Sequence, residues 1–195
     1  LALYTAIFGT LLGIVVALLR MSRVKLLKVL AGAYIEFLRG TPLLVQVLIV
    51  FYGLPQMGVK LPRMTAGTVA LVINSAAYMA EIVRSGIQAI DGGQTEASRS
   101  LGMNGAQTMI YIILPQAIKN ILPAIGNEFV SIIKESSILY TIGIYELTYQ
   151  ANKLASTNFR YLETLTISAL IYFVLTFTAS RLLGMLERRM RRGDR

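Results

Sequence analysis

The sequence predicts an all-α membrane protein with five transmembrane helices, and three observations carry that prediction. The 195 residues are 55% hydrophobic with a mean hydropathy of +0.61, which is too apolar for a soluble domain of this size. Uncharged runs long enough to cross a bilayer alternate with short polar segments. Most lysines and arginines fall on one side of the resulting topology. The length predicts a single transmembrane domain, residues 1–195.

The composition excludes several classes of function. Cysteine and histidine are both absent, so disulfides, thiolate metal sites and imidazole acid–base chemistry are unavailable. We therefore expect no catalytic residues, no metal site and no cofactor held by this chain. The formal charge of +9 does not indicate nucleic-acid binding, because the basic residues are not interleaved with aromatic residues on an exposed face.

The first predicted span is Leu1–Leu19, which is uncharged and would extend ~28 Å as a helix. A signal peptide is the alternative, but no basic region precedes the apolar run and no small-residue cleavage site follows it. The chain begins with Leu rather than Met, so we expect a few residues upstream. The basic cluster Arg20, Arg23, Lys25 and Lys28 comes next, as on a cytoplasmic side, so the first span runs from outside to inside.

The second predicted span is Gly40–Val59, which is also uncharged. Just before it, Glu36 and Arg39 lie one helical turn apart and are expected to pair. Pro42 predicts a kink near the start of the span and Pro55 predicts its end. A short external loop, 54–63, would follow.

The third predicted span is Met64–Ala80, the first with polar groups in its middle. Asn74, Tyr78 and Glu81 recur at spacings of four and three, so they share one helical face. This face either forms interhelical hydrogen bonds or lines a translocation path. A carboxylate near membrane depth favours the path.

Between the third and fourth spans lies a polar, glycine-bearing segment. Thr95 is expected to cap a first helix, with Glu96 at the positive end of its dipole. Gly102 would end that helix in the left-handed conformation, and Asn104 would cap a second helix running through 109–114. The prediction is a helix, a sharp corner and a helix, which either docks into another protein or packs on its own chain.

The spacing within this segment resembles a known family. Glu96-Ala97-Ser98, three residues, Gly102, nine residues, Ile112, one residue and Leu114-Pro115 resemble the EAA loop of ABC importer permeases, with Ser98 where the second alanine usually stands. The segments 39–46 and 80–87 resemble the polar amino-acid branch of these permeases. In that family the loop is the coupling helix that docks into the ATPase. The resemblance therefore implies the ATPase-coupling residues Glu96, Ala97, Ser98, Gly102, Ile112, Leu114 and Pro115.

The fourth predicted span, Ala117–Tyr145, is the most polar of the five. Glu128, Ser131 and Glu135 follow one face, and Asn127, Ser131 and Lys134 follow the adjoining one. Lys134 either pairs with a carboxylate of the bundle or serves a substrate, since an amino acid carries an ammonium and a carboxylate that need opposite partners. The candidate substrate-binding residues are Asn74, Tyr78, Glu81, Glu128, Ser131, Lys134 and Glu135.

The remaining segments complete the topology. Residues 143–160 are expected to form a second external loop, Thr164–Ser180 the last span, and the basic tail Arg188, Arg189, Arg191, Arg192 and Arg195 a cytoplasmic anchor that could also bind lipid headgroups. Of the 19 basic residues, fourteen fall inside, four outside and Lys134 within the membrane. This asymmetry predicts an external N-terminus, a cytoplasmic C-terminus and a cytoplasmic coupling segment.

The sequence contains no Gly-x-x-x-x-Gly-Lys-Ser/Thr loop, so any ATP must be bound by a partner. The resemblance implies the permease subunit of an ATP-driven importer for polar amino acids in the cell (inner) membrane. Its implied partners are an ATP-binding ABC subunit, a second permease subunit in a homo- or heterodimer, an extracytoplasmic amino-acid-binding protein and membrane lipids, but no nucleic acid. The acidic groups in the spans favour a basic substrate such as arginine, lysine or histidine.

Two other functions compete with this interpretation. A self-contained secondary transporter or channel would use the intramembrane carboxylates as ion sites, but five spans show no inverted repeat. A noncatalytic scaffold would not need four charged groups at membrane depth.

Overall fold

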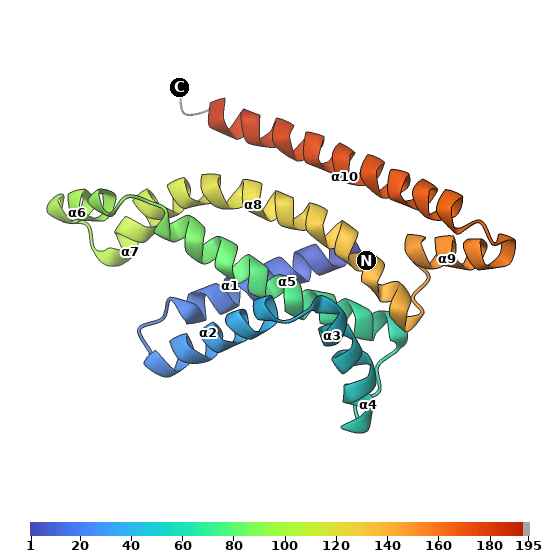
Figure 1. The fold of residues 1–195 in the computed structure, drawn as a ribbon. Coiled ribbons are helices and arrows are strands. Elements are labelled where there is room, and N and C mark those ends of the chain that lie inside the picture. The colour runs from blue at the N-terminus through green and yellow to red at the C-terminus, as the bar shows by residue number, and fades with distance from the viewer. Residues whose placement is uncertain (193–195) are drawn as a thin grey trace.

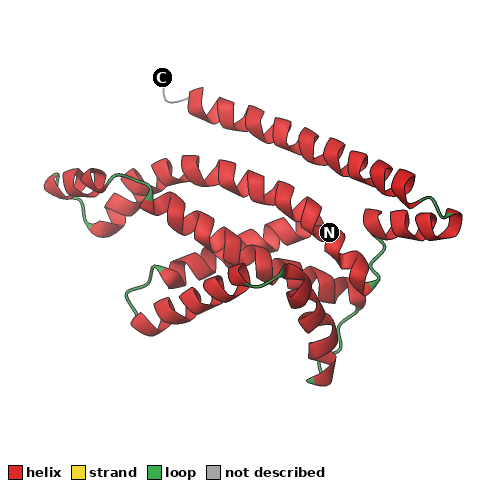
Figure 2. Cartoon of the chain, viewed as in Figure 1, coloured by secondary structure: helices red, strands yellow, loops and turns green. Residues whose placement is uncertain are grey.

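The computed structural model describes residues 1–192, and the regular structure within them is helical throughout (Figures 1 and 2). Four helical stretches are long and apolar enough to cross a membrane, and a bent pair of helices supplies a fifth span if it is counted as one. The four are α1 (Ala2–Arg20), α5 (Arg63–Gln88), the stretch Gly105–Ile142 and α10 (Tyr161–Arg192). With the bent pair counted as one span, the predicted all-α fold of five membrane helices is confirmed.

The bent pair joins α2 (Lys25–Gly40) to a helical stretch, Leu43–Gln56, at an angle of 108°. That stretch consists of α3 (Leu43–Leu48), a π-helical turn (Ile49–Gly53) and α4 (Leu54–Gln56). Pro42 lies at the break with extended backbone, because proline cannot donate the hydrogen bond that would continue α2. The predicted kink at Pro42 is therefore a full break, and the helical part of the span ends at Gln56, one residue after Pro55.

The centre of the fold is the close packing of α1 against α5, which also contacts α2, α3 and α8. Small residues let the two backbones approach: a Cβ added to Gly13 would lie 2.5 Å from the Met79 Cβ and 2.9 Å from the Ala76 carbonyl oxygen. A Cβ added to Gly9, four residues earlier, would lie 2.7 Å from the hydroxyl oxygen of Ser75. The pair α1–α5 therefore forms a close-packed unit on which the other helices are arranged.

The polar segment after α5 folds into α6 (Gly92–Ser100) and α7 (Gly105–Gln107). From α7 the chain continues through a π-helical turn (Thr108–Ile113) into α8 (Leu114–Glu135) and a 3₁₀ turn (Ser136–Ile142). Pro123 lies inside α8 without ending it. In Figure 1, α6 and α7 lie at one end of the molecule, while α9 (Leu147–Asn158) lies at the opposite end.

The expectation that residues 143–160 form an external loop is wrong over most of that range, because α9 is a helix of 12 residues. Its first turn is capped by Glu146, whose carboxylate accepts hydrogen bonds from the N–H groups of Thr148 and Tyr149 at 2.8 and 2.6 Å. The same carboxylate accepts a 2.8 Å hydrogen bond from the Tyr172 hydroxyl of α10. One acidic side chain thus caps α9 and joins it to α10.

The described part of the predicted basic tail lies at the end of α10. Arg188 and Arg189 are exposed there, and Figure 1 shows this end directed toward the α6 side of the molecule. The prediction for Arg195 lies outside the described residues.

Candidate functional site

The polar segment predicted to couple forms a helix, a corner and a helix, and we call residues 91–108 the coupling corner. Gly102 has φ +84°, so the predicted left-handed glycine is confirmed. Asn104 caps α7: its Oδ1 accepts a 3.0 Å hydrogen bond from the Gln107 N–H, and the Gln107 Oε1 accepts one of 2.9 Å from the Asn104 N–H. The predicted Thr95 cap is wrong, because Asp91 caps α6 through a 2.7 Å bond from the Gly93 N–H.

Two contacts hold α6 against the start of the fourth span. The hydroxyls of Ser98 and Thr108 lie 2.9 Å apart, and both residues are buried. Ser98 also donates to the Thr95 carbonyl at 2.9 Å, so its proton is used there and Thr108 is the donor between the two hydroxyls. Gln116 of α8 reaches the side chain of Gln94 at 3.4 Å. The corner is therefore fixed to the long α8 stretch by side chains of both elements.

The remaining coupling candidates differ in their exposure. Glu96, Ala97, Gly102, Leu114 and Pro115 are exposed, Ile112 is half-buried and Ser98 is buried. Leu101, which we did not place among the coupling residues, is 84% exposed at the tip of the corner. Leu101 thus joins Glu96, Ala97 and Gly102 on the exposed part of the coupling corner.

Asn74 is one of three candidate substrate-binding residues on the polar face of α5. Its side chain is hydrogen-bonded to another residue of this chain. It is 4% exposed, and its Nδ2 donates a 2.9 Å hydrogen bond to the Oε1 of Gln46 on α3. For Asn74, this contact is the interhelical hydrogen bond that was one of the two alternatives predicted for this face. Gln46 itself was not singled out from the sequence.

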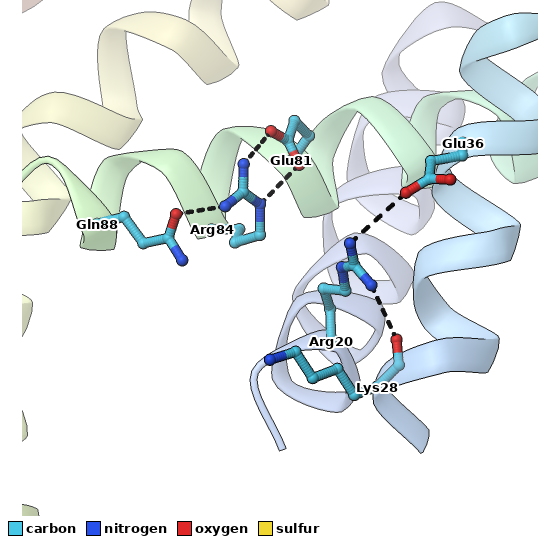
Figure 3. A network of polar contacts seen from close by, with 6 residues as sticks. All are labelled: Arg20, Lys28, Glu36, Glu81, Arg84 and Gln88. Carbon is cyan, nitrogen blue, oxygen red and sulfur yellow. Dashed lines mark hydrogen bonds and ion pairs between the residues drawn. The ribbon is translucent and has the colours of Figure 1, made fainter. Parts of the chain in front are cut away.

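The expected pairing of Glu36 with Arg39 is wrong. Glu36 instead lies 3.6 Å from Arg20 of α1, as Figure 3 shows. Arg39 turns toward α5, where its guanidinium lies 5.4 Å from the centre of the Tyr78 ring. Arg39, which we had expected to pair with Glu36, thereby joins the candidate polar face.

Glu81 lies within α5, because this helix extends beyond the predicted span to Gln88. Arg84, one turn later, binds the Glu81 carboxylate with two nitrogen atoms, one of them at 2.8 Å, and also reaches the side chain of Gln88 (Figure 3). The charge of Glu81 is therefore balanced by its own helix.

The α8 candidates differ in their exposure. Glu128, Ser131 and Glu135 are half-buried, whereas Lys134 is exposed and forms no ion pair with any residue in the described part of the chain. The charges of Glu135 and Arg39 both act on Glu128, and the charge of Arg39 also reaches Glu81. The structure thus brings α2, α5 and α8 together around one group of charged and aromatic side chains.

Comparison with known proteins places this geometry in a family. Residues 9–192 match the family described as binding-protein-dependent transport system inner membrane component. The chain belongs to this family. Among its members, the probable amino-acid permease protein YxeN of Bacillus subtilis (strain 168) is 41% identical over 97% of this chain and 86% of its own length. The arginine transport system permease protein ArtQ of the same organism is 42% identical over 97% and 87%.

Solved structures of transporters agree with this assignment. A chain of the crystal structure of an amino acid ABC transporter with histidines has a TM-score of 0.93 and 54% identity, over 96% of this chain and 88% of that one. An inward-facing structure of the MetNI methionine ABC transporter has a TM-score of 0.75 at 17% identity, over 97% and 90%, and supports the fold alone. This chain is therefore a multi-pass membrane protein with the fold of importer permeases.

Proposed function

We propose that this chain is the membrane-spanning permease subunit of an ATP-driven ABC importer for polar amino acids, in the cytoplasmic membrane. The observation that carries the proposal is the coupling corner, an exposed polar knob fixed to the same continuous helix that carries Glu128, Lys134 and Glu135. A displacement of the corner is thereby transmitted along α8 to the polar face. Because the sequence has no phosphate-binding loop, the displacement comes from a separate ATP-binding subunit.

The proposed assembly places the ATP-binding subunits at the α6–α7 end and an extracytoplasmic amino-acid-binding protein at the α9 end. A second permease subunit, identical or related, completes the path. The charges support this orientation: the basic cluster between α1 and α2 lies toward the α6–α7 end, whereas Lys60 and Lys153 belong to the loop before α5 and to α9 at the other end (Figure 1).

Cysteine labelling tests the orientation on a background free of native cysteine. In intact cells, an impermeant thiol reagent should label Lys60→Cys, whereas Gly105→Cys should react only after permeabilisation. Both positions are exposed, so accessibility within the protein is not the limiting factor. The reverse pattern would put the coupling corner on the side without ATP and overturn the proposal.

The decisive experiment measures transport in liposomes that contain the whole proposed assembly, with the second permease subunit, the ATP-binding subunits and the amino-acid-binding protein. We expect uptake of radiolabelled amino acid that requires ATP on the coupling-corner side and survives collapse of ion gradients by ionophores. Uptake without ATP that disappears with an ion gradient would instead identify the secondary transporter. No uptake and no stimulated hydrolysis under either condition would identify a scaffold.

The substrate is proposed to be a basic amino acid, since α8 presents two half-buried carboxylates beside one exposed lysine. The carboxylates would hold the cationic groups and Lys134 the substrate carboxylate. Relatives are named for arginine and for glutamine, so both serve as test ligands. Competition by arginine, lysine and histidine that exceeds competition by glutamine, and that Glu128→Gln diminishes, supports the proposal. Preferential competition by glutamine would contradict it.

A further inference from the structure

The break between α2 and α3 leaves backbone groups without the partners that a continuous helix would supply. The chain is extended at Thr41 and Pro42, and the two helical axes differ in direction by 108°. Carbonyls that a helix end leaves without an N–H partner need another donor, and those of Phe37, Leu38 and Thr41 accept from side chains here. Side chains must therefore stabilise this break.

Gln46 supplies most of these hydrogen bonds from the first turns of α3. Its Nε2 donates to the Leu38 carbonyl at 2.8 Å, to the Thr41 carbonyl at 3.1 Å and to the Thr41 hydroxyl at 2.9 Å. The Thr41 hydroxyl itself donates to the Phe37 carbonyl at 2.8 Å, which leaves its oxygen free to accept. One amide thus closes the C-terminal end of α2 onto the start of α3.

The other end of the same amide is bound to a different span. Because Nε2 faces backbone carbonyls, which only accept, Oε1 must point the opposite way, toward the Nδ2 of Asn74 at 2.9 Å. Gln46 and Asn74 are 7% and 4% exposed, so water does not compete for these bonds. The break is therefore held at a fixed place on α5.

Arg39 lies two residues before Thr41, at the end of α2. It immediately follows Leu38, one of the residues bound by Gln46, and its guanidinium lies over Tyr78, one turn beyond Asn74 on α5. Any shift of the break along α5 would move Arg39 relative to Tyr78 and to Glu128 of α8.

We propose that Gln46 is a positioning residue that fixes the α2–α3 break on Asn74 and so holds Arg39 at the edge of the substrate path. The inference rests on the proposed transport function. It assigns a share of the substrate site to the second span, through Arg39, which adds a second cation to Lys134 of α8.

Transport kinetics of the complex in liposomes test the inference. Gln46→Met keeps the length of the side chain and removes all four hydrogen bonds, and we expect it to raise the KM for uptake about tenfold, with a smaller change in the maximal rate. Tyr34→Phe is the matched control, because the Tyr34 hydroxyl also joins α2 to α5, through the Ile73 carbonyl at 2.6 Å, without touching the break. Its KM should stay within about twofold of the unmodified protein.

A double-mutant cycle separates positioning from general stability. If Gln46 acts through Arg39, then Gln46→Met should add little to the KM of Arg39→Met, because the positioned group is already absent. Additive effects, or an unchanged KM in assembled Gln46→Met protein, would overturn the inference. If the Gln46→Met protein does not assemble, Thr41→Val can replace it in the double-mutant cycle with Arg39→Met. Thr41→Val removes the hydroxyl that accepts a hydrogen bond from Gln46. Failure of the unmodified complex to import would instead count against the proposed function.

Discussion

The coupling corner and the polar region around the α2–α3 break are built in opposite ways. The corner is closed by contacts between residues that are close in sequence. Asp91 accepts a hydrogen bond from the N–H group two residues later, and Asn104 accepts one from the N–H group three residues later. The hydroxyls of Ser98 and Thr108, ten residues apart, are also in contact. The break depends on Gln46 reaching Asn74, 28 residues away, and on Arg39 reaching Tyr78 in another span. The structure of the coupling corner, which is proposed to move as one body, can be determined by contacts within its own sequence. A substrate path between spans requires side chains from several spans.

The largest expected loss of transport should follow a substitution in the proposed substrate path. Lys134→Met should abolish ATP-driven uptake and substrate-stimulated ATP hydrolysis, a loss of about 100-fold or more, because the exposed ammonium has no ion-pair partner in the described part of the chain and is proposed to bind the substrate carboxylate. Lys134→Arg keeps the charge and should retain part of the uptake.

The alternative role of Lys134 gives a different result. If Lys134 only balances a carboxylate of the bundle, Lys134→Met should lower the yield and the melting temperature of the complex, because it leaves a buried carboxylate without a counter-charge. Assembly, melting temperature and stimulated hydrolysis measured on one preparation distinguish the two. A well-assembled Lys134→Met complex with normal uptake contradicts both.

The next effect should arise at the coupling corner. A Cβ at Gly102 or at Gly105 would meet no atom within 4 Å, but only Gly102 has a positive φ, of +84°. Gly102→Val should therefore disturb the corner by about 1–2 kcal/mol and reduce uptake, whereas Gly105→Val should be nearly neutral. Uptake and co-purification of the ATP-binding subunit measure the difference, and equal losses in the two variants would show that backbone conformation is not the cause.

Local signals explain what the sequence could predict. Gly102 and Asn104 were predicted correctly because a left-handed glycine at a helix end and an Asn cap are patterns within one turn of helix. The cap of α6 was misplaced: Asp91, four residues before Thr95, caps this helix, which begins at Gly92. The position of a helix end thus depends on competition between neighbouring caps.

Long-range contacts explain what the sequence could not predict. Nothing near Gln46 indicates that its partner is Asn74, and the periodicity of α5 shows only that Asn74 faces another helix. Glu36 has an oppositely charged neighbour at Arg39, but Arg20 of α1 lies closer in space. The polarity of residues 143–160 suggested a loop, because the local cap at Glu146 was not recognised. The bond from Tyr172 of α10 to the same carboxylate could not be inferred from the sequence.

The next prediction concerns the stability of the region around the α2–α3 break. Asn74→Leu should lower the free energy of unfolding of the complex by about 1–3 kcal/mol, because it strands the buried Oε1 of Gln46. The melting temperature of the purified complex measures this loss. Thr68→Val is the control, since the Thr68 hydroxyl bonds only the Met64 carbonyl of its own helix and should change the melting temperature much less. Equal shifts would contradict a special role for the pair.

The smallest expected effect concerns Ser98, which stands where the EAA pattern usually has alanine. Ser98→Ala removes the 2.9 Å hydroxyl contact to Thr108 and should loosen α6 against the fourth span by about 1 kcal/mol, lowering the amount transported per ATP by about twofold. Ser100→Ala is the matched control, since that hydroxyl is exposed and bonds only the Glu96 carbonyl.

A second variant tests whether the hydroxyl pair itself matters for coupling. Ser98→Ala strands the buried Thr108 hydroxyl, whereas Ser98→Ala with Thr108→Val removes both polar groups and should recover part of the lost stability, because no buried donor is left unpaired. The ratio of transport to hydrolysis should stay low in the double variant if the bond stiffens the corner. A ratio that recovers with stability would mean that burial, and not the bond, fixes α6, and a ratio unchanged from the Ser100→Ala control would remove Ser98 from the coupling residues.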